Sequence, residues 1–358
     1  MSLLAGVLTL LAFLLLGQGW LTGMSGLWAP LGLFLWLFAA MLWLSFSVVH
    51  HADCLAIKLG EPYGTLILTL SVISIEVVMI SAIMLTGSES PGVGRDMMFA
   101  VLMIVLNGLV GLSLLCGSLR HLEQAHNLQG ANIFLAVLLP LAVLGLVLPN
   151  VTQSTEAGTY SNIQMLFAIL ASISLYGAFL AAQTLRHRGH FVAPGEDADS
   201  GHDHGDLEVH STGFHAVMLL ANMLPIVLLS KSMAKVIDYG IDAFAAPVAL
   251  GGVVIAILVL APEGMAAVNA ALSNQLQRSI NICLGSALAT IGMTIPAILI
   301  IGLSTGTPVV LGLEPVETVM LFATILASLN TFASNRTTVV HGVVHLVLFF
   351  AYLLMVFD

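Results

Sequence analysis

Long runs of apolar residues, separated by short polar stretches, fill almost the whole of this chain of 358 residues. A helix that crosses the hydrocarbon core of a membrane needs about 20 mainly apolar residues. The pattern predicts eleven such spans, over residues 3–21, 28–49, 64–86, 97–117, 131–150, 162–184, 213–235, 246–271, 281–303, 315–333 and 339–357. We therefore expect an all-α membrane protein with about eleven transmembrane helices, the first of them at the N-terminus in place of a cleaved signal peptide.

Composition supports a membrane protein and excludes several other classes. Hydrophobic residues make up 59% of the chain and charged residues 8%, whereas a soluble domain is about one quarter charged. The net charge of -10 and the lack of a basic patch argue against a nucleic-acid partner. The cysteines Cys54, Cys116 and Cys283 form no CxxC pair, and no HExxH sequence is present. These absences argue against a zinc site and against an intramembrane metalloprotease, so we expect a protein that is not an enzyme.

One long polar segment, within residues 186–212, divides the spans into six and five. With residues 1–24 set apart as an N-terminal helix, residues 27–185 and 213–358 each contain five spans. An odd number of spans makes the second unit enter the membrane inverted relative to the first, as in many secondary transporters. Gly64 and Glu76 are twelve residues apart, as are Gly251 and Glu263, and the two pairs are offset by 187 residues. The chain is thus predicted to contain two inverted five-helix repeats.

The basic residues predict the orientation of the chain, because short loops rich in Lys and Arg remain in the cytoplasm. The loops after even-numbered spans hold Lys58, Arg120, Arg186, Arg188, Arg278 and Arg336. The loops after odd-numbered spans hold Arg95 and Lys235. We expect a multi-pass protein of the cell inner membrane, with the N-terminus and loop 186–212 in the cytoplasm and the C-terminus outside.

Two glutamates are the main candidates for function. Glu76 and Glu263 each lie deep in an uncharged run, where an ionisable group costs a few kcal/mol or more. A carboxylate at that depth can hold a proton or bind a metal cation, and competition between the two is the simplest mechanism of antiport. The alternative is a protonated glutamate that only hydrogen-bonds a neighbouring helix.

Other residues near the glutamates could supply oxygen ligands. Pro262, next to Glu263, is expected to break or kink its helix and to free backbone carbonyls. The candidate side chains are Ser71 and Ser74 near Glu76, Asn107 in the fourth span, and Ser286, Thr290 and Thr294 in the ninth. The alternative for each side chain is a hydrogen bond between helices.

Histidines form two further groups. His202, Asp203 and His204 lie in the central loop and are possible metal contacts, although a solvated linker is an equal alternative. His341 and His345 share one face of the last span. They are interpreted as interhelical hydrogen-bonding groups, with a proton relay as the alternative.

Two stretches resemble a known family. They are VVHHADCLAIKLGEPYGTLILTLSVISIEVVMISA in the first predicted repeat and APEGMAAVNAALSNQLQRSINICLGSALATIGMTIP in the second. They are similar to the cation/proton exchangers of the calcium/cation antiporter superfamily, and most closely to the bacterial ChaA-type antiporters of Ca²⁺, Na⁺ and K⁺. The resemblance implies that Glu76 and Glu263 are the signature glutamates and that Gly285 and Ser286 match a following Gly-Ser. The Gly-Asn of the family signature is absent here, and a pocket with fewer amide ligands could favour Na⁺ or K⁺.

We therefore expect an antiporter in the lipid bilayer that exchanges Ca²⁺, Na⁺ or K⁺ for protons at Glu76 and Glu263 without a cofactor. A sodium/proton antiporter with little calcium transport is one alternative, and a proton-uncoupled cation channel is another. A membrane scaffold with a metal-sensing loop is a third. The sequence leaves the preferred ion, the stoichiometry and the oligomeric state open.

Overall fold

The computed structural model of the protein describes residues 1–59, 71, 73–74, 76–78, 80–81, 91–194, 210–247 and 249–357. In the first half of the chain its helices are α1 (Ser2–Thr22), α2 (Trp28–Leu59), α4 (Val93–Met103), η1 (Ile104–Leu109), α5 (Val110–His121), α6 (Leu128–Ala142), η2 (Val143–Val147), η3 (Leu148–Asn150), α7 (Asn162–Ala181), η4 (Ala182–Arg186) and η5 (Arg188–Phe191). In the second half they are α8 (Thr212–Phe244), α9 (Ala249–Leu272), α10 (Leu276–Thr305), α11 (Pro315–Thr331) and α12 (Val339–Met355).

The described helices confirm an all-α protein that crosses the membrane many times. Eight continuous helical segments are long and apolar enough to span it, and α11 and α12 are shorter apolar helices. These ten coincide with ten of the predicted spans. The remaining predicted span, 64–86, lies mostly outside the described residues, and those of its residues that are described are helical.

The chain forms two compact units. Unit 1 comprises residues 1–89 and 204–262 with Phe357, and unit 2 comprises residues 90–203 and 263–356 with Asp358. Each unit takes residues from both halves of the chain. The units therefore differ from the predicted repeats 27–185 and 213–358, whose assignment stays a prediction.

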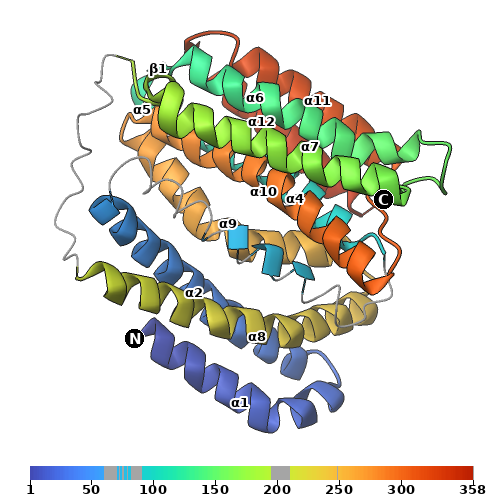
Figure 1. Ribbon diagram of the computed structural model, residues 1–358. Helices are drawn as coiled ribbons and strands as arrows, with labels where there is room; N and C mark the ends of the chain where they lie inside the picture. The colour runs from blue at the N-terminus through green and yellow to red at the C-terminus, as the bar shows by residue number, and fades with distance from the viewer. Residues whose placement is uncertain are drawn as a thin grey trace. The chain divides into compact units, whose positions relative to one another are not determined.

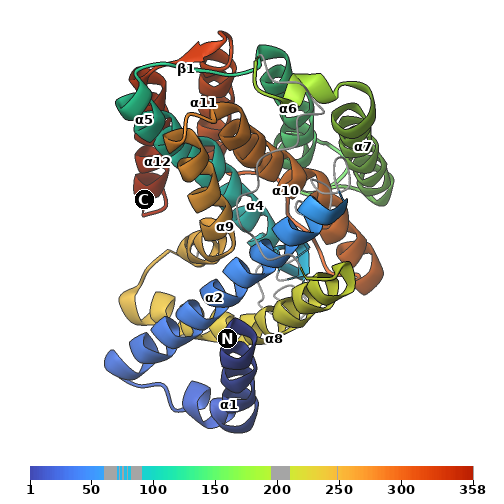
Figure 2. The same ribbon diagram turned by 90° about the vertical axis from the view of Figure 1, so that its left-hand side faces the viewer.

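Unit 1 is built on α1, α2 and α8, which lie side by side (Figures 1 and 2). A Cβ at Gly6 would lie 2.6 Å from Cδ2 of Leu44, so the bare glycine lets α1 approach α2 closely. The indole N–H of Trp36 donates to Oγ1 of Thr9 over 3.1 Å and joins the same two helices. Apolar packing with a few polar links therefore holds this unit together.

Unit 2 is centred on α10, which packs against α4, η1, α5, α6 and α7. The last helix of the first predicted repeat, α7, packs on α10, the third helix of the second. Reciprocally, α12 packs on η1 and α5, which belong to the third helix of the first. Two repeats related by a two-fold axis would produce this exchange of partners.

Charged residues separate between the two ends of unit 2. One end is joined by the strands β1 (Gln124–Ala125) and β2 (Arg336–Thr337) and by a hydrogen bond from Asn281 to the carbonyl of Phe191. We call it the basic end, because among its described residues Arg120, Arg186, Arg188, Arg278 and Arg336 outnumber one acidic residue, Glu123. The opposite, acidic end is joined by a bond from the Leu311 N–H to the Gly158 carbonyl, and its elements carry Arg95 with Asp96, Glu156, Glu314 and Glu317.

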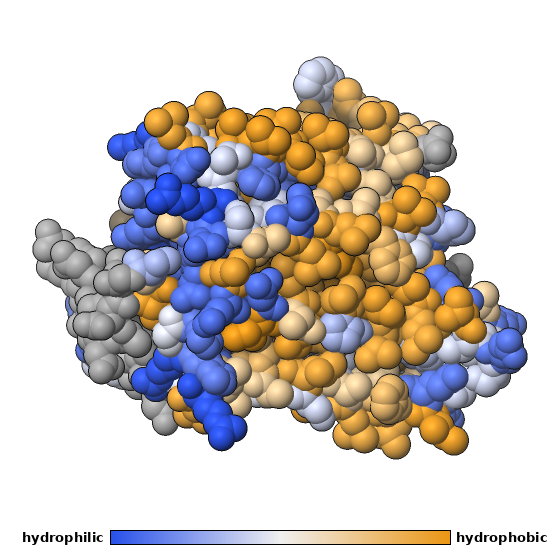
Figure 3. Space-filling view, turned by 90° about the horizontal axis from the view of Figure 1, so that it is seen from above, coloured by the Kyte–Doolittle hydropathy of each residue, from blue (hydrophilic) through white to orange (hydrophobic). Residues whose placement is uncertain are grey.

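Hydrophobic side chains cover the surface between polar regions. Figure 3 shows a broad hydrophobic band across one face, with hydrophilic residues gathered toward its edges. On α7 the large exposed side chains are Ile163, Leu166, Phe167, Leu170 and Ile173. A stripe of that kind would be unfavourable in water, and it is the surface expected of a helix in contact with lipid.

His126 is a buried histidine between α5 and α6 at the basic end. Its ring is 1% exposed and packs edge-on against Phe332. Burial, assisted by the nearby His341, lowers the pKa of His126 to about 4 from its usual value near 6.5. The imidazole is therefore neutral in the folded protein at neutral pH.

The tight crossing of α12 and α5 gives a test of the packing of unit 2. A Cβ at Gly342 would lie 2.5 Å from the backbone nitrogen of Leu115, so α12 would have to move away from α5. Gly342→Val should lower the free energy of unfolding in detergent by about 1–3 kcal/mol. Gly177→Val is the matched control, because nothing lies within 4 Å of a Cβ at that helical glycine. Equal stabilities of the two variants would contradict this packing.

His126 gives a second test, through pH. The unfolded chain takes up a proton on this residue below about pH 6.5, whereas the folded chain takes it up only near pH 4. The contribution of His126 to stability is therefore complete above pH 6.5 and falls by about 3 kcal/mol as the pH drops to 4. Unfolding of the wild type and of His126→Phe, measured in detergent across this range, should differ in slope. Parallel pH profiles would rule out a buried neutral His126.

Candidate functional site

Glu263 lies on α9, directly after Pro262. The sequence predicted a break or kink at the proline, but α9 continues as one helix from Ala249 to Leu272, so there is no break. The hydrogen bonds of the neighbouring residues keep the backbone helical across Pro262. The proline still has no N–H, and the carbonyl of Leu258 therefore lacks the usual donor four residues later.

The carboxylate of Glu263 is half-buried and binds a serine of α10. The hydroxyl of Ser286 donates to Oε2 of Glu263 over 2.6 Å. Among the described residues neither of the two ion pairs includes Glu263. Gly264 allows close packing here, since a Cβ at this position would lie 2.7 Å from Cδ2 of Leu109 in η1. The carboxylate is thus stabilised by a neutral donor, which leaves its charge available to a cation or a proton.

Ser286 belongs to a polar stripe along α10. The stripe consists of Ser279, Cys283, Ser286, Thr290 and Thr294, all of them buried. Their spacing of four, three, four and four residues keeps them on one helical face, and the stripe extends over about 22 Å of the helix axis. The structure therefore places the predicted residues Ser286, Thr290 and Thr294 on a common face, with Glu263 bound near its middle.

Asn107 lies in a different buried network, within η1. Its Nδ2 donates to Oγ1 of Thr324 over 2.7 Å, and its Oδ1 lies 3.3 Å from Nδ1 of His345. Nε2 of His345 in turn lies 3.0 Å from Oγ1 of Thr331. These bonds join η1, α11 and α12, and they use the amide that the sequence proposed as an ion ligand. The interhelical interpretation of His345 is confirmed, whereas His341 caps α12 through Thr338.

The π-helical turn η1 gives Asn107 its position. A π-turn inserts one extra residue into a helix, and such turns are common at functional sites. Residues 104–109 adopt this form between two regular helices, α4 and α5. The local distortion turns the amide toward α11 and α12, where it is completely buried. Sequence periodicity gives no indication of this turn.

Glu76 is described separately, because it belongs to unit 1. Its side chain is 3% exposed, and the neighbouring Ser71 is also buried. In helical geometry Ser71 and Ser74 lie about 140° and 160° around the axis from Glu76. They do not share its helical face, and their role as supporting oxygens stays a prediction.

In the described part of the chain, no group of three or more His, Cys, Asp or Glu side chains could hold a metal ion. The possible loop contacts His202, Asp203 and His204 lie outside the described residues.

Some buried polar residues were missed by the sequence reasoning. Thr324, Ser328 and Thr331 lie on one face of α11 and are almost fully buried, and Ser113 of α5 and Ser279 of α10 are buried as well. The four- and three-residue spacing of the α11 residues within an apolar span was a detectable signal. Ser113 and Ser279 are distant in sequence, so only the fold relates them.

Known transport proteins are similar to this chain over most of its length. The family model described as sodium/calcium exchanger protein matches residues 29–185 and 214–357. The sodium-potassium/proton antiporter ChaA of Escherichia coli (strain K12) is 41% identical over 315 residues, which cover 87% of this chain and 85% of that protein.

Solved structures share the fold at lower identity. Native YfkE has a TM-score of 0.75 and 17% identity, covering 100% of this chain and 99% of its own. The H⁺/Ca²⁺ exchanger CAX has a TM-score of 0.71 and 16% identity, covering 98% and 87%. At these identities the likeness concerns the arrangement of the helices.

The network around Asn107 can be tested by a double-mutant cycle. Asn107→Ala removes the amide that bonds Oγ1 of Thr324 and Nδ1 of His345, and it should lower the free energy of unfolding by about 1–3 kcal/mol. Thr324→Val should have a smaller additional effect in the Asn107→Ala background than in the wild type, because both substitutions remove the same bond. Ser154→Ala, at an exposed bond in a loop, is the control. Additive effects on thermal unfolding in detergent would show that the two residues do not interact.

Proposed function

Because this chain belongs to the sodium/calcium exchanger protein family, we propose that it is a secondary antiporter that exchanges a metal cation for protons. Members of this family are transporters and not enzymes. The observation that carries the proposal is the Glu263 carboxylate within an apolar helix, where it accepts a hydrogen bond from the neutral hydroxyl of Ser286. The activity named for the 41% identical relative supports it.

The proposed mechanism is competition at the carboxylate. When Glu263 is protonated it is neutral, and its burial costs little. When the proton leaves, the negative charge needs either the Ser286 donor or a cation. Oγ of Ser286 can donate to the carboxylate in one state and offer its lone pairs to a cation in the other. One site can therefore hold a proton or a cation in turn, and each that binds displaces the other.

Glu76 is proposed as the second ion-binding carboxylate. It is buried in a helical segment of unit 1, at the position related to Glu263 by the 187-residue offset. A buried ionisable residue within a membrane span is costly and rare outside functional sites. The positions of the two glutamates in the predicted repeats support equal participation in transport.

We infer that Na⁺ or K⁺ is preferred over Ca²⁺. Ca²⁺ takes six to eight oxygens, several of them from carboxylates. Around Glu263 the described residues provide a serine hydroxyl, and they contain no group of three or more His, Cys, Asp or Glu side chains that could hold a metal ion. A monovalent cation requires less negative charge, and the sodium-potassium/proton activity named for the Escherichia coli relative supports this choice.

The separation of charge in unit 2 supports an orientation. Cytoplasmic loops carry an excess of Lys and Arg, so the basic end should face the cytoplasm and the acidic end the outside. An acidic outer surface would also attract cations. With the inner membrane as its location, the proton gradient would drive the cation out of the cell.

Replacing the two carboxylates by neutral amides tests the proposal. Glu263→Gln and Glu76→Gln should each abolish proton movement driven by Na⁺, K⁺ or Ca²⁺, because a glutamine neither releases a proton nor neutralises a cation. The measurement is cation-dependent fluorescence dequenching of a pH dye in everted vesicles. Glu123→Gln, at an exposed ion pair with Arg336, is the control and should retain exchange.

Full activity in both variants would refute the role of the glutamates. Cation currents without proton movement in wild-type proteoliposomes would identify a channel instead. The order of the wild-type rates for Na⁺, K⁺ and Ca²⁺ decides the preferred ion.

A further inference from the structure

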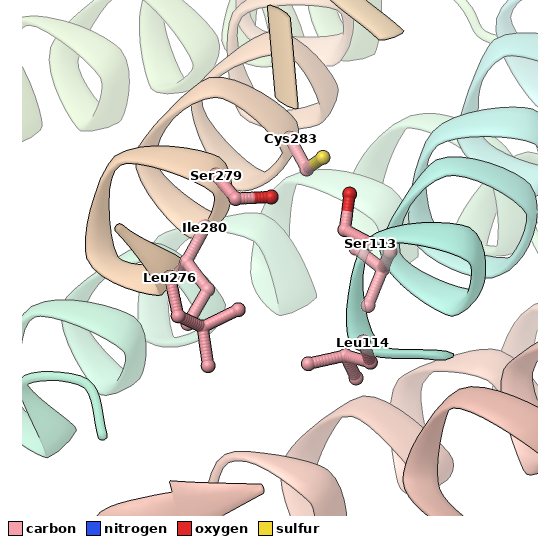
Figure 4. Close-up of a pocket in the computed structure, with 7 residues that line it drawn as sticks. Ser113, Leu114, Leu276, Ser279, Ile280 and Cys283 are labelled. Carbon is pink, nitrogen blue, oxygen red and sulfur yellow. The ribbon is translucent and has the colours of Figure 1, made fainter. Parts of the chain in front are cut away.

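A small cavity lies between α5 and α10 in unit 2. Figure 4 shows it with its polar side chains. Its lining residues are Val110, Ser113 and Leu114 from α5 and Leu276, Ser279, Ile280 and Cys283 from α10. The space open to the centre of a water molecule is about 10 Å³, which corresponds to a single water.

The cavity contains the polar groups that a water needs. The hydroxyls of Ser113 and Ser279 and the thiol of Cys283 are directed toward the same space (Figure 4). Ser113 is 2% exposed, and its Oγ has no hydrogen-bond partner among the described residues. An unpaired buried hydroxyl costs about 1–3 kcal/mol, and a water bound by two to four polar groups removes that cost.

The cavity lies on the stripe that leads to Glu263. Ser279 and Cys283 are seven and three residues before Ser286 on α10, which corresponds to about 10 and 5 Å along the helix axis. In the other direction the stripe ends beside Arg278, at the basic end. The cavity is thus between the partner of Glu263 and the basic end of unit 2.

We propose that this cavity binds one water and that the water carries protons between the basic end of unit 2 and Glu263. Ser113, Ser279 and Cys283 position the water, and Ser286 is the carrier next to Glu263. This inference rests on the proposed antiport at Glu263.

The transfer balances at every step. When a cytoplasmic cation displaces the proton of Glu263, Oε2 gives that proton to Oγ of Ser286, which releases its own proton to a lone pair of the water. The water then releases another proton to the solution at the basic end. Water and serine are unchanged afterwards, the carboxylate has lost one proton, and the solution has gained one.

The test uses the full chain in proteoliposomes. Ser113→Ala, Ser279→Ala and the double variant each remove hydroxyls that hold the water. Each single variant should lower the maximal rate of cation/proton exchange about tenfold, equivalent to ~1.4 kcal/mol. The double variant should lower it no further, because both serines hold the same water. The Na⁺ concentration that gives half the maximal rate should stay the same.

Ser118→Ala is the matched control. Ser118 is a buried serine of α5 whose Oγ also has no partner among the described residues, but it does not line this cavity. Its variant should exchange at the wild-type rate. Thermal unfolding in detergent shows which variants fold. If the double variant does not fold, the rates of the two single variants decide the question.

Three results would overturn the inference. One is wild-type maximal rates in variants that fold, and another is a double effect equal to the product of the single effects. Loss of exchange through a raised half-saturating Na⁺ concentration would also contradict it, since that would indicate a role in cation binding. A wild-type protein that moves no protons would instead refute the proposed antiport itself.

Discussion

The cost of a polar group in hydrocarbon governs this structure. Inside a bilayer every backbone N–H and C=O must find a partner within the protein, so the chain crosses it as helices. In the described residues the two short strands, β1 and β2, lie in the connections between spans. The same cost applies to side chains, which explains why Asn107, Thr324 and His345 bind one another. A carboxylate that remains in this environment despite the cost, such as Glu263, indicates a functional site.

Helix α10 combines two tasks on different faces. One face packs closely on its neighbours, as at Gly292, where a Cβ would lie 3.0 Å from the ring of Tyr176. Another carries the polar stripe that includes Ser286, the donor to Glu263. Helix α10 is packed on several sides by the other helices of unit 2. A change in the protonation of Glu263 therefore acts, through Ser286, on a helix that its neighbours hold firmly. A central and rigid helix is a suitable support for a site that must distinguish small cations.

The chemistry proposed for Glu263 follows from its neutral partner, Ser286. Ser286 is neutral, and a hydroxyl can serve both protonation states of the carboxylate and a bound cation. A basic partner would hold the carboxylate ionised and exclude cations. In the proposed antiport the same serine can therefore bind the carboxylate whether a proton or a cation is present.

The sequence by itself determined the number and position of the described spans, since an apolar run of about 20 residues has few other stable structures in a membrane. It also identified Glu263 and Ser286, because isolated polar residues are conspicuous in such runs. The tertiary structure decided what they bind. It placed Ser286 on the Glu263 carboxylate, directed Asn107 into a network with Thr324 and His345, and kept α9 helical through Pro262. Those outcomes depend on contacts between residues far apart in the chain and on a π-turn, neither of which hydrophobic periodicity records.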